Sequence, residues 1–164
     1  MYESPKLSDE QIVQALAEQP KSIGSLTAGL SQNALRRPPA PEGWSLNDVL
    51  AHLRSCGDMW GKYIALILVK DQPTFRAVNP TTWIKSTNYP DLDFPASFRA
   101  YTKQRVQLVK KLRGVPKEAW SRRATVTGGG RPRQRTVRDY ALWLANHERS
   151  HLGQIARLAA EHRR

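Results

Sequence analysis

The sequence lacks the features that mark secreted and membrane proteins. Its one cysteine, Cys56, has no partner for an intramolecular disulfide. The longest apolar run, residues 64–69, is far shorter than the roughly 18 residues that a transmembrane helix needs. Residues 1–6 contain no apolar core of the kind found in secretory signals. These absences predict a cytoplasmic protein that does not span a membrane.

Acidic residues are scarce: Asp and Glu number 14 against 26 Lys and Arg, and the formal net charge is +12. Such an excess can serve nucleic acids, anionic membrane surfaces or acidic small molecules. The basic residues are spread along the chain, however, without the interleaved aromatic residues of a single-strand binder. We therefore interpret most of them as solvated surface and do not expect nucleic-acid binding. The densest group, Arg131, Arg133, Arg135 and Arg138, is expected to attract an anionic substrate if it borders a site.

The alternation typical of strands is almost absent, and apolar residues at three- and four-residue spacing indicate four long helical segments. Pro20 interrupts the first segment and leaves open whether it is one kinked helix or two pieces. A length of 164 residues suits one domain. We therefore predict a single all-α domain over residues 1–164. Residues suited to cap the helix starts are Ser8, Ser45, Asp93 and Thr136.

Long connections separate these helical segments. Residues 71–93 contain three prolines, and a compact domain seldom keeps so long a connection without a function. We expect this connection to lie over a site. Residues 36–43 are predicted as a loop, residues 116–120 as one short turn and residues 124–127 as extended at most.

Three histidines stand where a helical core would favour leucine. His147 and His151 lie four residues apart on the apolar stripe of the last helix, and His52 lies on the apolar face of the second. A single buried histidine usually finds an ordinary hydrogen-bond partner. Three that line the same bundle core are better explained by a shared ion. We predict that His52, His147 and His151 bind a divalent metal.

Three imidazole ligands leave at least one coordination position open, as in reactive metal sites. A metal there would lower the pKa of bound water, or of a thiol or hydroxyl, and present it as a nucleophile. All-nitrogen ligation favours zinc or nickel, with iron and manganese as further options.

Other possible ligands have simpler explanations. Asp48 and Cys56 share the face of His52, but Asp48 is explained as a helix cap and Cys56 as a small core residue. Glu148 lies about 100° round the helix from His147, so we expect it at the rim of the site or hydrogen-bonded to a ligand. His162 is expected on a solvated tail.

Two catalytic motifs compete with this interpretation. Residues 147–151 match the letters of the zincin motif HExxH, but the third histidine stands upstream on another helix and no supporting sheet is predicted. The glycines at 128–130 lack the lysine and the serine or threonine of a phosphate-binding loop. Neither motif displaces the three-histidine site.

Several short fragments, each weak alone, form a specific combination in this order and spacing. They are residues 43–45 (GWS), 49–53 (VLAHL), 120–124 (WSRRA), 136–139 (TVRD) and 146–155 (NHERSHLGQI). Together they cover nearly the whole chain, and the sequence resembles the DinB-like superfamily, also called the DinB/YfiT-like metalloenzymes.

The resemblance implies a four-helix bundle with long connections between helices. It also implies a divalent metal held by three histidines, which correspond to His52, His147 and His151. Better-understood relatives act on thiols, such as S-transferases using bacillithiol or mycothiol and a thiol-dependent maleylpyruvate isomerase. The resemblance therefore suggests a low-molecular-weight thiol as a cofactor.

These observations predict a metal-dependent enzyme that activates a thiol or water, either for S-transfer to a small molecule or for its hydrolysis. The alternatives are a basic nucleic-acid-binding helical domain and a metal-binding bundle without catalysis. An exposed apolar stripe on the first or third long helix would permit a homodimer.

Overall fold

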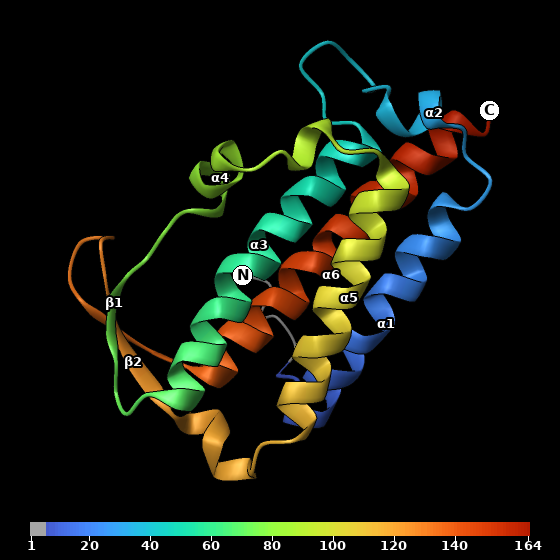
Figure 1. Cartoon of the computed structure of the whole chain (residues 1–164). Coiled ribbons are helices and arrows are strands. Elements are labelled where there is room, and N and C mark those ends of the chain that lie inside the picture. The colour runs from blue at the N-terminus through green and yellow to red at the C-terminus, as the bar shows by residue number, and fades with distance from the viewer. Residues whose placement is uncertain (1–5) are drawn as a thin grey trace.

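A computed structural model describes residues 6–164; residues 1–5, which carry most of the argument against a secretory signal, lie outside the described residues. Four long helices form an elongated bundle, as Figure 1 shows, and confirm the predicted four-helix, mainly α architecture. Each long helix packs against two others, because the first and second in chain order both contact the third and fourth in a four-cornered arrangement. In chain order the four are α1 (Asp9–Thr27), α3 (Leu46–Val69), α5 (Phe94–Arg113) and α6 (Val137–His162).

The helices begin at the predicted caps. The side chains of Ser8, Ser45 and Thr136 each accept a hydrogen bond from the backbone N–H three residues later. The side chain of that later residue in turn accepts a hydrogen bond from the backbone N–H of the cap. Asp93 accepts from the backbone of Ala96 at 2.8 Å. Each capping box satisfies donors that a helix start would otherwise leave without a partner. Local sequence therefore sets where all four helices start.

Helix α1 continues unbroken through Pro20, which answers the question that the sequence left open. Proline removes one backbone hydrogen bond inside a helix and usually ends or kinks it. Here the proline is buried, and Ile12, Leu16 and Ile23 on either side of it are fully buried. Tertiary packing of this apolar face offsets the lost bond.

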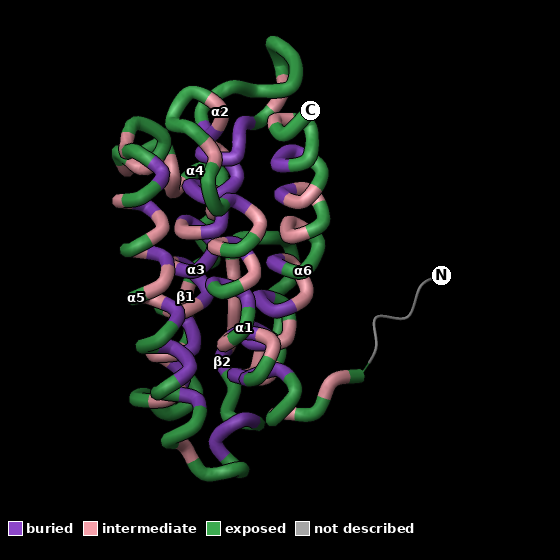
Figure 2. Tube along the Cα trace, turned by 90° about the vertical axis from the view of Figure 1, so that its right-hand side faces the viewer, coloured by how far each residue is buried: buried purple, intermediate pink, exposed green. Residues whose placement is uncertain are grey.

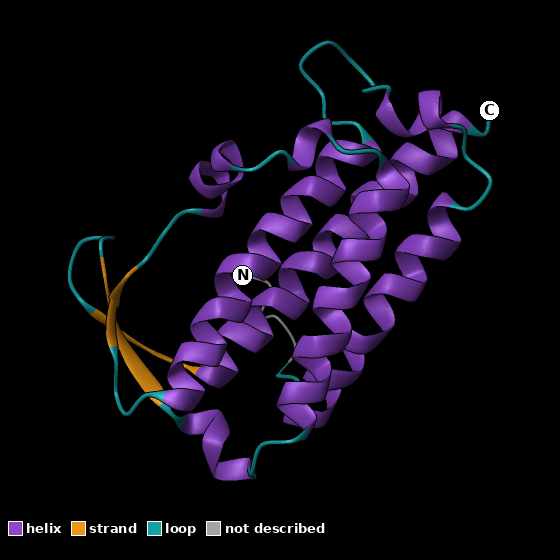
Figure 3. Ribbon diagram, viewed as in Figure 1, coloured by secondary structure: helices purple, strands orange, loops and turns teal. Residues whose placement is uncertain are grey.

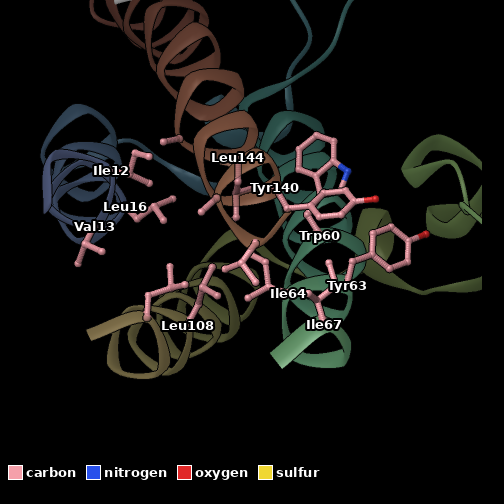
Figure 4. Packing of buried hydrophobic residues seen from close by; sticks show 14 of the residues in the cluster. Ile12, Val13, Leu16, Trp60, Tyr63, Ile64, Ile67, Leu108, Tyr140 and Leu144 are labelled. Carbon is pink, nitrogen blue, oxygen red and sulfur yellow. The ribbon is translucent and has the colours of Figure 1, made fainter. Parts of the chain in front are cut away.

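The buried residues follow the inner faces of the helices, as the purple segments in Figure 2 show. One cluster joins Leu16 of α1 to Ile64 of α3, Leu108 of α5 and Leu144 of α6, the packing drawn in Figure 4. A second cluster, which includes Leu53 and Ile155, fills the other end of the bundle. Among residues 6–164, no helix combines the length and hydrophobicity needed to cross a membrane.

Shorter elements complete the connections. A one-turn helix at residues 32–36 precedes the predicted loop and was not predicted. The turn expected near residues 116–120 is confirmed as a 3-10 helix. These elements are α2 (Gln32–Arg36), α4 (Pro80–Trp83) and the 3-10 helices η1 (Ile84–Ser86), η2 (Tyr89–Asp91) and η3 (Lys117–Ser121).

A small sheet lies beside the bundle, on the side of α3, as the orange strands in Figure 3 show. It contains β1 (Thr74–Arg76), β2 (Arg123–Thr127) and β3 (Arg133–Thr136), in that spatial order. β1 pairs parallel with β2, and β2 pairs antiparallel with β3. The expectation of almost no sheet was wrong here, because strands of three to five residues are too short to show alternation.

The connection at residues 71–93 is tied to α3 along its length. The backbone N–H of Val78 donates to the Tyr63 hydroxyl at 2.7 Å, and the Ser55 hydroxyl donates to the carbonyl of Pro80 at 2.7 Å. Farther on, the Tyr89 hydroxyl donates to Asp58 at 2.6 Å. These bonds hold the connection over one face of α3, the helix that carries His52.

Candidate metal centre

The three predicted histidines meet in space. His147 and His151 stand one turn apart on α6, and His52 reaches them from α3, which packs against α6. The Nε2 atom of His147 lies 3.2 Å from Nε2 of His52 and 3.2 Å from Nε2 of His151. One ligand nitrogen from each ring falls within 4.8 Å of the other two. The apolar faces of α3 and α6 therefore bring one ligand nitrogen from each of the three rings close together.

These spacings suit a shared cation. Two nitrogens bonded at about 2.0–2.1 Å to a tetrahedral metal lie about 3.3–3.4 Å apart, close to the observed 3.2 Å. Hydrogen bonds alone satisfy the group poorly, because His147 Nε2 carries at most one proton and faces two other ring nitrogens. The donor set therefore fits a metal ion.

A hydrogen bond to Gln154 fixes the ring orientation of His151. Its Nδ1 lies 2.8 Å from the side-chain oxygen of Gln154, one turn further along α6. An amide oxygen only accepts hydrogen bonds, so Nδ1 carries the proton and Nε2 presents its lone pair to the other histidines. Gln154 was not predicted as a site residue, although its position three residues after His151 was the available signal.

The imidazoles of His52 and His147 are expected to be uncharged at neutral pH. Burial, and then repulsion from His151, lowers the pKa of both rings from 6.5 to about 4, and for His147 the neighbouring His52 adds to the effect. Metal binding requires neutral imidazole, so protons do not compete for these two nitrogens near pH 7.

The weaker candidates lie where simpler roles explain them. Asp48 caps α3 through the backbone N–H and hydroxyl of Ser45, as predicted. Cys56 is buried in the core with Sγ 3.6 Å from His52 Nε2, and burial, followed by the charge of Glu148, raises its pKa to about 12. It is therefore a neutral thiol beside the histidines. His162 lies at the end of α6, where its Nδ1 is 3.1 Å from the Arg37 guanidinium.

Glu148 does not stand at the rim, and that prediction was wrong. Its carboxylate is fully buried and forms an ion pair with Arg105 of α5, while the Tyr101 hydroxyl donates to it at 2.9 Å. Arg105 also donates to Gln19 of α1 at 3.1 Å. The helical angle indicated a different face from His147 but could not show which neighbouring helix that face meets.

A pocket of about 590 Å³ opens beside the histidines. His52 and His147 line it, together with residues 77–81 of the long connection, as expected for that segment. Of the predicted arginine group, Arg138 lies elsewhere, because it pairs with Asp9 at 2.9 Å. Trp44 packs against the His52 ring, with centroids 5.1 Å apart, and is not part of the pocket wall. The arginines that do line the pocket are Arg131, Arg133 and Arg135.

The model of the DinB superfamily matches residues 15–155. The chain belongs to the DinB superfamily. Among solved structures it is similar to YfiT from Bacillus subtilis, described as a probable metal-dependent hydrolase with an unusual four-helix bundle topology. That match has a TM-score of 0.80 at 18% identity and covers 98% of this chain and 93% of YfiT, so it supports the bundle fold. No curated protein matches the sequence.

Proposed function

We propose that this DinB superfamily protein is a metal-dependent enzyme whose divalent ion is held by His52, His147 and His151. The convergence of the three rings carries the proposal: His147 Nε2 lies 3.2 Å from Nε2 of both His52 and His151, beside a pocket. Zinc or nickel suits this nitrogen set best, with iron and manganese as further options. When bound, the ion supplies a Lewis acid that lowers the pKa of a water or thiol.

The residues of the chain have separable roles in this proposal. Gln154 holds the His151 ring with its lone pair toward the site. The rings of Trp44 and Trp60 pack against His52 and His147, with centroids 5.1 Å apart in each pair, and help to fix the orientation of the two imidazoles. The pocket admits a small electrophile to the side that His52 and His147 line.

Two reactions fit this arrangement: hydrolysis with water as the nucleophile, and S-transfer with a low-molecular-weight thiol. We put hydrolysis first, because YfiT is described as a probable metal-dependent hydrolase. Thiol transfer is supported by analogy with thiol-using members of the superfamily. The alternatives of a nucleic-acid-binding domain and a non-catalytic metal-binding domain predict no turnover with either nucleophile.

The test uses p-nitrophenyl acetate as a small electrophile, with and without N-acetylcysteine, after loading the protein with zinc, nickel or manganese. We expect metal-dependent release of nitrophenol that is lost in His147→Ala. His162→Ala is the matched control, because it removes a histidine of the same helix outside the site. Activity that survives chelation or the His147→Ala change would contradict the proposal.

A homodimer and a cytoplasmic location also remain proposals of the sequence analysis. Light scattering would distinguish one chain of 18.6 kDa from a pair. Fractionation of cells that express the native chain would test the location.

A further inference from the structure

Three arginines stand at alternate positions before and along β3. Successive side chains of a strand point to opposite faces, so residues two apart share a face. Arg131, Arg133 and Arg135 all line the pocket beside the histidines. Gln134, between two of them, bonds instead to the Thr125 hydroxyl at 2.8 Å. The period of the strand thus directs one row of guanidinium groups to the pocket.

The strand register identifies the face independently. Arg135 pairs with Ala124, which is fully buried, and Arg133 pairs with Val126, which also lines the pocket. Directly paired residues of antiparallel strands lie on the same face. Arg123 pairs with Thr136 in the same hairpin, but it is exposed and lies outside the pocket wall. Both faces of the hairpin therefore carry arginine, but Arg133 and Arg135 line the pocket and Arg123 does not.

Among the described residues, the positive charges of this wall have no ion-pair partner. In the part of the chain that the structure describes, no aspartate or glutamate lines the pocket. Within residues 6–164 the ion pairs are Arg105–Glu148 and Arg138–Asp9, and neither involves the three pocket arginines. Like charges gathered in a concave site focus a positive potential. Guanidinium groups also match the geometry of carboxylate and phosphate, which they can bind through paired hydrogen bonds.

Aromatic rings supply the remaining surface of the pocket. Trp60 and Trp143 stack with centroids 4.8 Å apart, and Tyr63 and Tyr140 also line the pocket. Trp143 is 50% exposed, so part of its indole ring is free to contact a ligand in the pocket. A volume of about 590 Å³ lies in the range of small-molecule sites.

We propose that this pocket binds a small organic anion with a flat apolar body, its acidic group held by Arg131, Arg133 and Arg135 and its body by the aromatic rings. The inference rests on the proposed function, because it names the substrate class for the same site. His52 and His147 line the same pocket, so an anion held at the arginine wall presents the rest of its structure to the histidines.

The test measures binding to the metal-free full-length protein, so that no ion can attract the probe. The probe is 2-naphthoate, compared with the neutral 2-naphthamide of nearly the same shape, and binding is followed by tryptophan fluorescence. We expect naphthoate to bind at least about tenfold more tightly than naphthamide. Arg133→Ala and Arg133→Gln should each weaken naphthoate binding about tenfold. Arg123→Ala, which removes the same charge from the outer face, should leave it unchanged.

Equal binding of the two probes, binding of neither, or an equal loss in Arg123→Ala and Arg133→Ala would overturn the inference. Circular dichroism of each variant shows whether a loss of binding reflects unfolding. Metal uptake separates this inference from the proposed function. Naphthoate binding by a protein that takes up no metal would support the anion site and contradict the metal enzyme, whereas metal uptake without naphthoate binding would do the reverse.

Discussion

His147 and Glu148 are consecutive residues of α6, yet they belong to two opposite kinds of polar site. Glu148 is enclosed by α1, α5 and α6, and its oxygens accept bonds from Arg105 and Tyr101. His147 faces α3 and the pocket, with its Nε2 directed at two other ring nitrogens and its buried Nδ1 unbonded among the described residues. The polar atoms of Glu148 have protein partners and fit a structural role, whereas the three converging ring nitrogens are better satisfied by a shared cation.

The pKa values follow the same division. Burial, and then the charge of Glu148, raises the pKa of Tyr101 well above 10, so its hydroxyl remains a donor. Burial opposes the charge of Arg105 most strongly, but Glu148 and Tyr101 together raise its pKa. On the Glu148 side of α6, the ion pair therefore keeps Arg105 charged. On the histidine side, burial lowers the pKa of His52 and His147 and keeps lone pairs free.

The largest expected effect comes from breaking the buried Arg105–Glu148 ion pair, the closed site of α6. Glu148→Ala leaves the Arg105 charge buried without a partner, which should lower the free energy of unfolding by about 3–5 kcal/mol. The double variant Arg105→Leu/Glu148→Leu should lose much less, because both charges are removed together. Urea unfolding of the metal-free protein measures both. A Glu148→Ala protein as stable as wild type would contradict a structural role.

Metal binding at the three histidines, the open site of α6, should raise the free energy of unfolding by a smaller amount. At a free metal concentration of 100 times Kd, binding to the folded state alone adds about 2.7 kcal/mol. Thermal unfolding with and without zinc measures this gain. We expect it to vanish in His151→Ala and to persist in His162→Ala; a gain that survives in His151→Ala would place the metal elsewhere.

Gln154→Ala should weaken the open site without removing a ligand. Loss of the bond that orients the His151 ring is expected to reduce metal affinity about tenfold to a hundredfold. A competition titration with a chelator of known affinity measures the change. Gln14→Ala, at a glutamine exposed on α1, is the control and should leave the affinity unchanged.

Lowering the pH should produce the smallest effect, because solvent reaches His52 and His147 in part and screens them. Their pKa is about 4 in the folded protein and about 6.5 when unfolded, so the unfolded chain takes up protons first as the pH falls. The metal-free protein should therefore lose stability progressively from pH 6.5 to 4. Replacing both histidines by leucine should flatten this slope; an unchanged slope would contradict the lowered pKa values.

Local patterns predicted the bundle and the three histidines because they depend on neighbours within a few residues. The caps at Ser45 and Thr136 and the spacing of His147 and His151 are of this kind. The β1–β2 pairing could not be foreseen, because the two strands lie about 50 residues apart in the chain. Arg138 was grouped wrongly with the pocket arginines because the strand period ends at Thr136, where α6 begins.

The error over Glu148 has a similar cause. Helical geometry gave the angle between Glu148 and His147, but the partner Arg105 lies on another helix, 43 residues away in the chain. A signal was present, because Arg105 stands among Tyr101, Leu108 and Leu112 on the buried face of α5. An arginine on an apolar stripe calls for a buried carboxylate, and Glu148 was a fitting candidate.

The most direct test is elemental analysis of protein purified without a metal-chelating tag, as wild type, His52→Ala, His147→Ala and Glu148→Gln. The account predicts roughly one divalent ion per chain in wild type and in folded Glu148→Gln, and none in either histidine variant. A wild-type protein that takes up no added metal, or histidine variants that keep it, would contradict the three-histidine site.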